Sequence, residues 1–294
     1  MSKKILLFDL DGTLLKSDKT ISEDTMNAVM TCKEKGYLIG VVTSRSEQNT
    51  YAFLKELQPD ILITSGGALV KKQGEYLYKA TFSVQETNAM IRAARKVCGE
   101  ACEITIDTLD AHYWNYKTNP KDTDRTWGDS IWTDYHDLAQ ESLKMCVEIF
   151  DERQAECLKT MLPDCDMLRF SDGYWYKFTK KNVTKENAIE KVCEPIGITN
   201  AEIIAFGDDY ADIGMLNMAG IGVAMGNAID AVKEVADIVI GTNDNDGIAD
   251  YLKSLICDAS PMRSEKYNID KLAGIRYNCG IQSRQAWWRK NAGR

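Results

Sequence analysis

Four short apolar runs, each ending at a polar or glycine-containing segment, constrain the fold of this chain more than any other feature. They are ILLF (5–8) before Asp9, LIGVV (38–42) before Thr43, ILI (61–63) before Thr64, and IIAF (203–206) before Gly207. Runs of this length without polar alternation are typical of strands that are buried on both faces, as strands are in a parallel sheet.

Helical patterns lie between these runs. Ser22 to Lys35 and Ser46 to Leu57 both place apolar residues on one face and end near Gly36 and Pro59. The alternation of strands and helices predicts an α/β fold with a doubly wound, mainly parallel, Rossmann-like sheet. Ligands bind beyond the carboxyl ends of such strands. We therefore expect Asp9, Thr43 and Asp208 to converge.

The middle of the chain has a different pattern, with aromatic strand-like segments joined by short turns. This pattern favours an antiparallel sheet with helices on one face, and predicts an inserted α+β cap domain. The expected strands are 103–107, 112–116, 145–150, 166–170 and 174–178, and the expected helices are 83–98 and 151–162. The predicted domains are a catalytic core at 1–81 and 180–256, a cap at 82–179, and a C-terminal extension of unknown role at 257–294.

Composition narrows the class of protein. The chain is 44% hydrophobic and 27% charged, as in an ordinary soluble protein, and no apolar run approaches the roughly 20 residues that span a bilayer. The amino-terminal residues do not resemble a signal peptide, and the nine cysteines are scattered, so we expect reduced thiols and a cytoplasmic location. The net charge is −8, although the segment from Cys257 onward is basic. We expect neither nucleic-acid nor membrane binding.

The segment FDLDGT places the carboxyl groups of Asp9 and Asp11 at the end of a buried strand. Two such carboxylates repel each other and resist desolvation, so they need a cation, a proton or a reaction to accommodate them. An EF-hand calcium loop is excluded, because the glycine is the fourth residue of the loop and the twelfth is Thr20 rather than Glu. A turn with two solvated carboxylates is the simpler alternative.

Several motifs in order resemble the haloacid dehalogenase superfamily, and within it the Cof-like hydrolases with the larger α/β cap. The resemblance extends to about residue 255. It rests on FDLDGTLL (8–15), VVTSR (41–45), NVTKENAI (182–189), AFGDDYADIGML (205–216), GVAMGNAIDAVKEVAD (222–237) and TNDNDGIADYL (242–252).

The resemblance implies a role for each acidic residue. Asp9 would attack phosphorus and form an aspartyl-phosphate, while Asp11 would act as general acid and then as general base. Mg²⁺, the implied cofactor, would be held by the Asp9 carboxylate, the Asp11 carbonyl oxygen and Asp208. Asp212 would orient metal-bound water without touching the metal; alternatively, it is a helix N-terminal carboxylate stabilised by the helix dipole.

Phosphate-binding candidates lie at Thr43, Ser44 and Lys185. Thr43 ends a buried strand and can donate its hydroxyl and backbone N–H to phosphoryl oxygens, although such a residue also serves as a strand-end cap. A lone lysine is usually a solvated surface charge. Lys180 and Lys181 lie nearby, but the V-T-K-x-x-A-I pattern selects Lys185 as the residue that neutralises the phosphoryl group.

Two positions depart from the family pattern. Ala211 stands where Cof-like proteins usually carry Asn, and Gly66-Gly67 replaces the usual Asn-Gly after the third strand. In addition, TSR at 43–45 replaces the commoner Thr-Gly-Arg. Loss of the amide at 211 removes a polar group normally near the phosphate, which raises the possibility of reduced turnover.

The implied function is a Mg²⁺-dependent phosphatase of a small phosphorylated metabolite, such as a sugar phosphate, pyridoxal phosphate or a flavin nucleotide. The chain would act as a monomer or weak homodimer. Two alternatives stay open: a phosphomutase of the same fold, and a phosphate-ligand-binding protein with impaired turnover. The cap would set specificity, and its tryptophans could stack on a ring of the substrate or simply pack on the sheet. These are Trp114, Trp127, Trp132 and Trp175.

Overall fold

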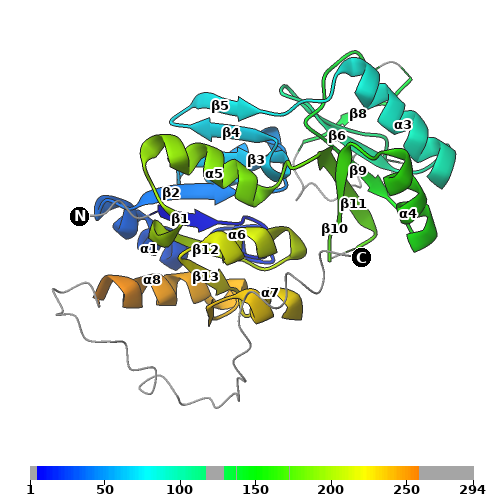
Figure 1. The fold of residues 1–294 in the computed structure, drawn as a ribbon. Coiled ribbons are helices and arrows are strands. Elements are labelled where there is room, and N and C mark those ends of the chain that lie inside the picture. The colour runs from blue at the N-terminus through cyan, green and yellow to red at the C-terminus, as the bar shows by residue number, and fades with distance from the viewer. Residues whose placement is uncertain (1–4, 117–128, 137, 172, 258–294) are drawn as a thin grey trace. The chain divides into compact units, whose positions relative to one another are not determined.

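The structure, a computed structural model, describes residues 5–116, 129–136, 138–171 and 173–257. These residues form two sheets (Figure 1). The larger sheet has the strand order β14-β13-β12-β1-β2-β3-β4-β5. Its strands are β1 (Ile5–Phe8), β2 (Leu38–Val42), β3 (Ile61–Thr64), β4 (Leu69–Lys72), β5 (Glu75–Lys79), β12 (Ile203–Gly207), β13 (Ile221–Ala224) and β14 (Ile238–Val239).

Strand pairing in the larger sheet is parallel from β14 to β3 and antiparallel from β3 to β5. The predicted doubly wound, mainly parallel sheet is therefore confirmed. The antiparallel hairpin of β4 and β5 was not foreseen from the sequence. It extends one edge of the sheet through a turn at Gln73 and Gly74, both of which have positive φ angles.

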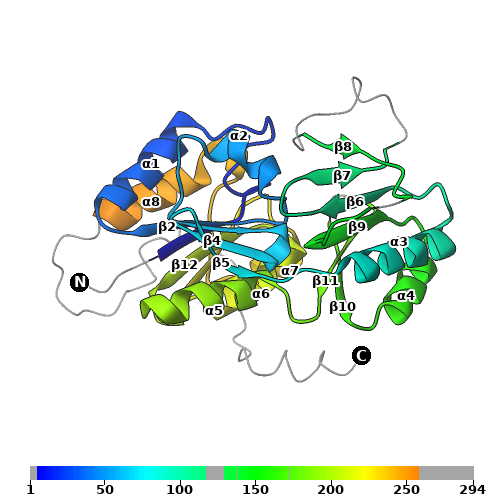
Figure 2. The same ribbon diagram turned by 90° about the horizontal axis from the view of Figure 1, so that it is seen from above.

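Helices cover both faces of this sheet, with α1 and α8 on one face and α5 and α6 on the other (Figures 1 and 2). Ser22 caps α1 and Thr184 caps α5, each by accepting a backbone N–H of the first turn. The helices are α1 (Glu23–Glu34), α2 (Tyr51–Leu54), α5 (Lys185–Ile196), α6 (Ile213–Met218), α7 (Asp230–Val235) and α8 (Gly247–Cys257).

The core lies between the sheet and these helices. Every residue of β1 is fully buried, and Phe8 stacks on Phe206 of the neighbouring strand with ring centroids 4.7 Å apart. This packing fixes the carboxyl ends of β1 and β12 side by side, with the Asp9 amide donating to the Phe206 carbonyl at 2.9 Å. The position of Asp9 and Asp208 thus follows from the packing of apolar strands.

The second sheet has the strand order β10-β11-β9-β6-β7-β8 and is antiparallel except for the β7–β8 pair. Helices α3 and α4 cover one of its faces (Figure 2). This confirms an α+β insertion in the predicted place; its boundaries at 82 and 179 stay a prediction. The elements are α3 (Val84–Cys98), β6 (Ile104–Asp107), β7 (His112–Trp114), β8 (Ile131–Trp132), β9 (Lys144–Glu148), α4 (Glu152–Met161), β10 (Cys165–Arg169) and β11 (Trp175–Lys180).

The helix expected over 46–57 is wrong in extent. Only Tyr51–Leu54 is α-helical, after a 3₁₀ turn at Gln48–Thr50. The Ser46 hydroxyl accepts the Asn49 N–H as a helix N-cap does, but the Thr50 hydroxyl donates to the Glu47 carbonyl, an acceptor of the first turn. Such bonds compete with the regular helical pattern.

The cysteines that the structure describes are free thiols. Within the described residues, none of the helices combines the length and the hydropathy that a bilayer span requires. The expectations for Trp127 and for the extension after Cys257 lie outside the described residues.

Gly67 sets how closely the turn after β3 approaches the first residue of α5. A Cβ atom at Gly67 would lie 2.2 Å from the Thr184 carbonyl oxygen, and φ is +105°. We expect Gly67→Ala to reduce the free energy of unfolding by about 2–4 kcal/mol, since both the clash and the positive φ are costly. Denaturant unfolding of the two proteins measures this difference.

Gly74→Ala is the matched control, because Gly74 has φ +87° but a Cβ atom there would meet nothing within 4 Å. It should cost only about 1–2 kcal/mol, from the positive φ alone. Equal losses in the two variants would show that the approach to Thr184 is not tight.

Candidate active site

Three carboxylates and one ammonium meet at the carboxyl ends of the central parallel strands. Asp9 follows β1, Asp208 follows β12, and Asp212 lies in the 3₁₀ turn after β12. One oxygen from each carboxylate lies within 4.8 Å of the others. The sequence predicted that Asp9, Thr43 and Asp208 would converge at this edge of the sheet. The structure places all three there.

Lys185 is the cation among them. Its Nζ lies 2.5 Å from Asp9 Oδ1 and 2.7 Å from Asp212 Oδ1, and the side chain is almost fully buried. Lys185 is the first residue of α5 and directly follows Thr184, the residue that caps this helix. Its neighbours take other partners: Lys180 pairs with Glu86 and Lys181 with Asp166.

Asp212 has both oxygens engaged. Lys185 donates to Oδ1, while Oδ2 accepts the backbone N–H groups of Asp208 and Asp209 at 3.0 and 3.1 Å. Asp212 therefore fixes the loop that carries Asp208. Asp208 is held from the other side by the Thr13 hydroxyl, which donates to its Oδ1 at 2.7 Å.

The charges at this cluster do not balance. Burial raises the pKa of Asp9 well above its usual value, although Lys185 opposes the shift, and burial together with Asp212 raises the pKa of Asp208 to about 7. Three carboxylates face one ammonium. This donor set fits a divalent cation, because hard carboxylate oxygens are the ligands that Mg²⁺ prefers and the cation would offset the excess negative charge.

Asp11 lies apart from this cluster, in contact with two cations. Arg45 donates to both of its oxygens, at 2.5 and 2.7 Å, and Lys19 donates at 2.9 Å. Burial raises the pKa of Asp11, but these contacts outweigh it and leave the pKa below its ordinary value. Asp11 is therefore an ionised carboxylate in this arrangement. Sequence reasoning missed Arg45 as its partner, although the residue stands in the TSR motif.

Thr43 and Ser44 form the end of β2. The Thr43 N–H donates to the Ile63 carbonyl at 2.8 Å, so the expectation that this N–H serves a phosphoryl group is wrong: it is used by the sheet. The Thr43 hydroxyl accepts the Arg45 N–H at 3.1 Å and keeps its own proton to donate. The buried Ser44 hydroxyl has no hydrogen-bond partner, which leaves a polar atom at the site in need of one.

Residues of the second sheet reach the same strand ends. Asp107 Oδ2 accepts from the Ser65 hydroxyl at 2.8 Å and lies 3.0 Å from Lys144 Nζ, which also donates to the Ser44 carbonyl at 2.5 Å. His112 Nδ1 lies 2.7 Å from Asp107 Oδ1. Burial opposes ionisation of Asp107, but Lys144 and His112 lower its pKa to about 2.

Sequence reasoning missed this group. Its charged residues alternate with apolar ones along β6 and β9, a pattern that indicates a solvent-exposed face. The face is instead buried: Asp107 is 0% and Lys144 4% exposed. The sequence signal that remains is a pair of opposite charges on neighbouring strands. Asp107 of β6 pairs in register with Lys144 of β9.

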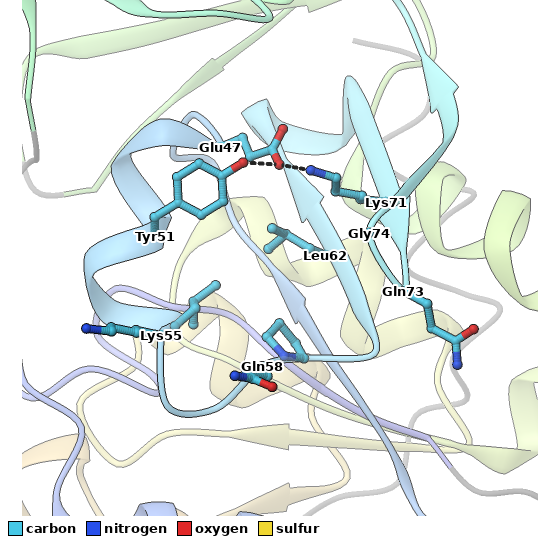
Figure 3. Close-up of a pocket in the computed structure, with 10 residues that line it drawn as sticks. Glu47, Tyr51, Lys55, Gln58, Leu62, Lys71, Gln73 and Gly74 are labelled. Carbon is cyan, nitrogen blue, oxygen red and sulfur yellow. Dashed lines mark hydrogen bonds and ion pairs between the residues drawn. The ribbon is translucent and has the colours of Figure 1, made fainter.

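A separate pocket lies beside α2 and β3 (Figure 3). Glu47 at its edge accepts hydrogen bonds from Tyr51, Lys71 and Tyr76. Glu47 is thus paired with Lys71, and none of the acidic residues of the cluster lines this pocket.

Comparison with known proteins agrees with this geometry. Residues 6–252 match the family model described as haloacid dehalogenase-like hydrolase. The chain is 29% identical to 5-amino-6-(5-phospho-D-ribitylamino)uracil phosphatase YitU of Bacillus subtilis, over 85% of this chain and 96% of the relative. It is 27% identical to pyridoxal phosphate phosphatase YbhA of Escherichia coli, over 86% and 99% of the two chains.

Solved structures show the same fold. The HAD subclass IIB sugar phosphatase BT4131 superposes with a TM-score of 0.75 at 27% identity, covering 86% of this chain and 99% of that one. The match extends over both sheets. The chain therefore belongs to the haloacid dehalogenase-like hydrolases, as a Cof-like member, and is an enzyme that hydrolyses phosphoric monoesters.

Proposed function

We propose that this protein is a Mg²⁺-dependent phosphatase that removes the phosphoryl group from a small metabolite through an aspartyl-phosphate on Asp9. The observation that carries the proposal is the Lys185 ammonium between Asp9 and Asp212, next to Asp208. Relatives that carry phosphatase names, including one for pyridoxal phosphate and one for a phosphoribityl compound, support a small phosphorylated substrate.

The residues that would hold the cation are Asp9 and Asp208, together with the Asp11 carbonyl oxygen. Asp212 is left out of this set because its two oxygens already accept from Lys185 and from two backbone N–H groups. When bound, Mg²⁺ supplies positive charge that offsets the carboxylates and the phosphoryl dianion.

In the first half-reaction, an Asp9 carboxylate oxygen attacks phosphorus, and the bond from phosphorus to the leaving oxygen breaks. Lys185 and the Thr43 hydroxyl stabilise the phosphoryl oxygens, and the Ser44 hydroxyl gains the partner it lacks. The leaving alkoxide takes a proton from Asp11. In the second half, water attacks phosphorus, gives its proton to the Asp11 carboxylate, and frees Asp9 and inorganic phosphate.

The observed contacts of Asp11 suit the second half-reaction, in which Asp11 accepts a proton from water. Arg45 and Lys19 favour the ionised form, which is the form that accepts a proton from water. To act as an acid, Asp11 must first be protonated, which requires its bonds to Arg45 to loosen. A phosphoryl dianion nearby would draw the Arg45 guanidinium toward itself and so raise the pKa of Asp11.

Asp9→Asn should lower the rate of phosphate release by at least about 1000-fold, because it removes the nucleophile. A phosphate-release assay over a panel of phosphorylated metabolites with Mg²⁺ measures the rate, and circular dichroism checks that the fold is kept. Asp209→Asn is the matched control, since the Asp209 carboxylate accepts from the Ser171 and Tyr210 N–H groups. Unchanged turnover in Asp9→Asn would refute the mechanism.

The same assay separates the phosphatase from a phosphomutase. A phosphatase should release free phosphate from monophosphates with no bisphosphate activator, because water accepts the phosphoryl group. A phosphomutase would instead depend on the activator and return the group to an isomeric monophosphate. Activity that appears only with a bisphosphate would overturn the proposal in favour of the mutase.

Mg²⁺ affinity should fall as the pH drops from 8 to 6. Asp208, with its pKa raised to about 7, is protonated below that pH, and the metal must displace the proton. We expect binding to weaken by at least about tenfold per pH unit below 7, because Asp9, the other carboxylate ligand, also has a pKa raised by burial and couples a further proton; calorimetry measures the affinity. Asp208→Asn should abolish binding, whereas Asp209→Asn should keep binding and move its pH dependence slightly to lower pH, because the Asp209 charge adds to burial and Asp212 in raising the pKa of Asp208. An affinity that does not change with pH would exclude these carboxylates as ligands.

A further inference from the structure

Lys177 of β11 is a buried cation without a partner. It is 5% exposed, and its Nζ makes no hydrogen bond and no ion pair with any residue that the structure describes. Its Nζ is not among the fully buried polar atoms that lack a partner, so the ammonium still opens to solvent although the rest of the side chain is buried. A lysine that is almost buried is usually paired, and this one is open to an anion that the chain itself does not provide.

The position of Lys177 in the second sheet directs it toward the strand ends of the first. Tyr176 and Phe178 belong to the apolar core on the helix side, so Lys177 lies on the opposite face. Lys177 pairs in register with Cys146 and with Leu168. Leu168 and Trp175 on that face are half-buried, whereas the buried residues around Lys177 are polar or small. These buried residues are Thr105, Asp107, Lys144, Cys146 and Thr179.

The surroundings of Lys177 are positively charged. Burial, and then the ammonium groups of Lys185 and Lys144, lower the pKa of Lys177 to about 8. Both of those lysines have carboxylate partners of their own. Glu186 is close enough to act on Lys177 but forms no ion pair with it. The positive charge of Lys177 is thus left for a ligand.

Gly66 provides the space that the ammonium occupies. A Cβ atom at Gly66 would lie 2.8 Å from Lys177 Nζ and 3.1 Å from its Cδ. Any larger residue at position 66 would displace the side chain of Lys177 from its present position. The glycine at 66 and the lysine at 177 therefore depend on each other.

The position of Gly66 in the first sheet indicates how far Lys177 lies from the phosphoryl group bound at Asp9. Gly66 follows β3, and its N–H donates to the Thr43 carbonyl at 3.0 Å. Asp9 follows β1, and β2 lies between β1 and β3. With about 4.8 Å between neighbouring strands, the two strand ends are roughly 10 Å apart. Burial lowers the pKa of Lys177, and Lys185, which contacts Asp9, is still close enough to lower it further. A group held by Lys177 is therefore on the leaving part of the substrate, close to the phosphoryl group.

We propose that Lys177 binds a second anionic group on the leaving part of the substrate, in the space left by Gly66. The enzyme then selects phosphomonoesters that carry a further carboxylate or phosphate. This inference rests on the proposed function for the identity of the phosphorylated ligand, but direct binding tests it without turnover.

Binding is measured by calorimetry in the full-length Asp9→Asn protein with Mg²⁺, using two pairs of probes. 3-Phosphoglycerate is compared with glycerol 3-phosphate, and fructose 1,6-bisphosphate with fructose 6-phosphate. In at least one pair, the compound with the extra anion should bind about tenfold more tightly, as expected for a charge-assisted contact. Lys177→Met should remove this preference and leave the affinity of the other member within about twofold.

Two further variants control the experiment. Lys180→Met removes a lysine of the same strand that is only half-buried and is paired with Glu86, and it should keep the preference. Gly66→Asn accepts the φ of +69° better than most residues but occupies the space of the ammonium, so it should lower the preference as Lys177→Met does. The double variant Gly66→Asn/Lys177→Met should show no further loss, because both changes remove one contact.

The outcomes separate this proposal from the proposed function. No preference in either pair, or a preference that survives Lys177→Met, overturns the second-anion site. An equal loss for both members of a pair in Lys177→Met overturns it too, since the lysine then contacts the phosphoryl group itself. A preference that depends on Lys177, in a wild-type protein that releases no phosphate, supports the site and refutes the phosphatase.

Discussion

The excess of buried negative charge around Lys185 is the constraint on which the rest of the site depends. Apolar strands bring Asp9 and Asp208 together, and a single ammonium with Asp212 keeps them there. Burial of this kind is costly unless the charges are paired. The site is therefore incomplete without a cation, and it accepts a phosphoryl dianion only once the negative charge has been offset.

The second sheet carries an excess of positive charge. Asp107 balances Lys144, but no carboxylate of the described residues balances Lys177. The strand ends of the first sheet thus carry an excess of carboxylates, and the buried polar face of the second sheet carries an excess of lysines. The proposed orientation of the substrate, with the phosphoryl group toward β1 and the leaving group toward the cap, rests on this asymmetry.

The fold and the acidic cluster were predictable because they depend on local patterns. A buried strand shows as an unbroken apolar run, and the polar residue that ends it lies at the carboxyl edge of the sheet. The motif register likewise singled out Lys185 from its neighbours. Their roles in catalysis rest on the resemblance to the family and stay predictions.

The polar residues of the cap were not predictable, because their burial depends on which sheet face meets the core. Alternation along β6, β9 and β11 is the same for an exposed face and for a polar buried one. The Thr43 N–H was misassigned because sheet pairing with β3 is not visible in β2 alone. Gly66 showed as a departure from the family pattern, but only the structure connects it with Lys177. Ala211 lies in the turn between Asp208 and Asp212.

The polar contact between the cap and the core has a consequence for how the enzyme admits its substrate. This contact consists of hydrogen bonds and an ion pair among Ser44, Ser65, Asp107 and Lys144. A small apolar cluster, which includes Leu69 and Leu143, accompanies it. Groups of this kind exchange protein partners for water at a small net free energy, whereas separating two apolar surfaces costs energy in proportion to the area exposed. Opening the cap to admit a substrate would therefore expose only the small apolar cluster around Leu69 and Leu143, while the apolar cores of both sheets stay closed.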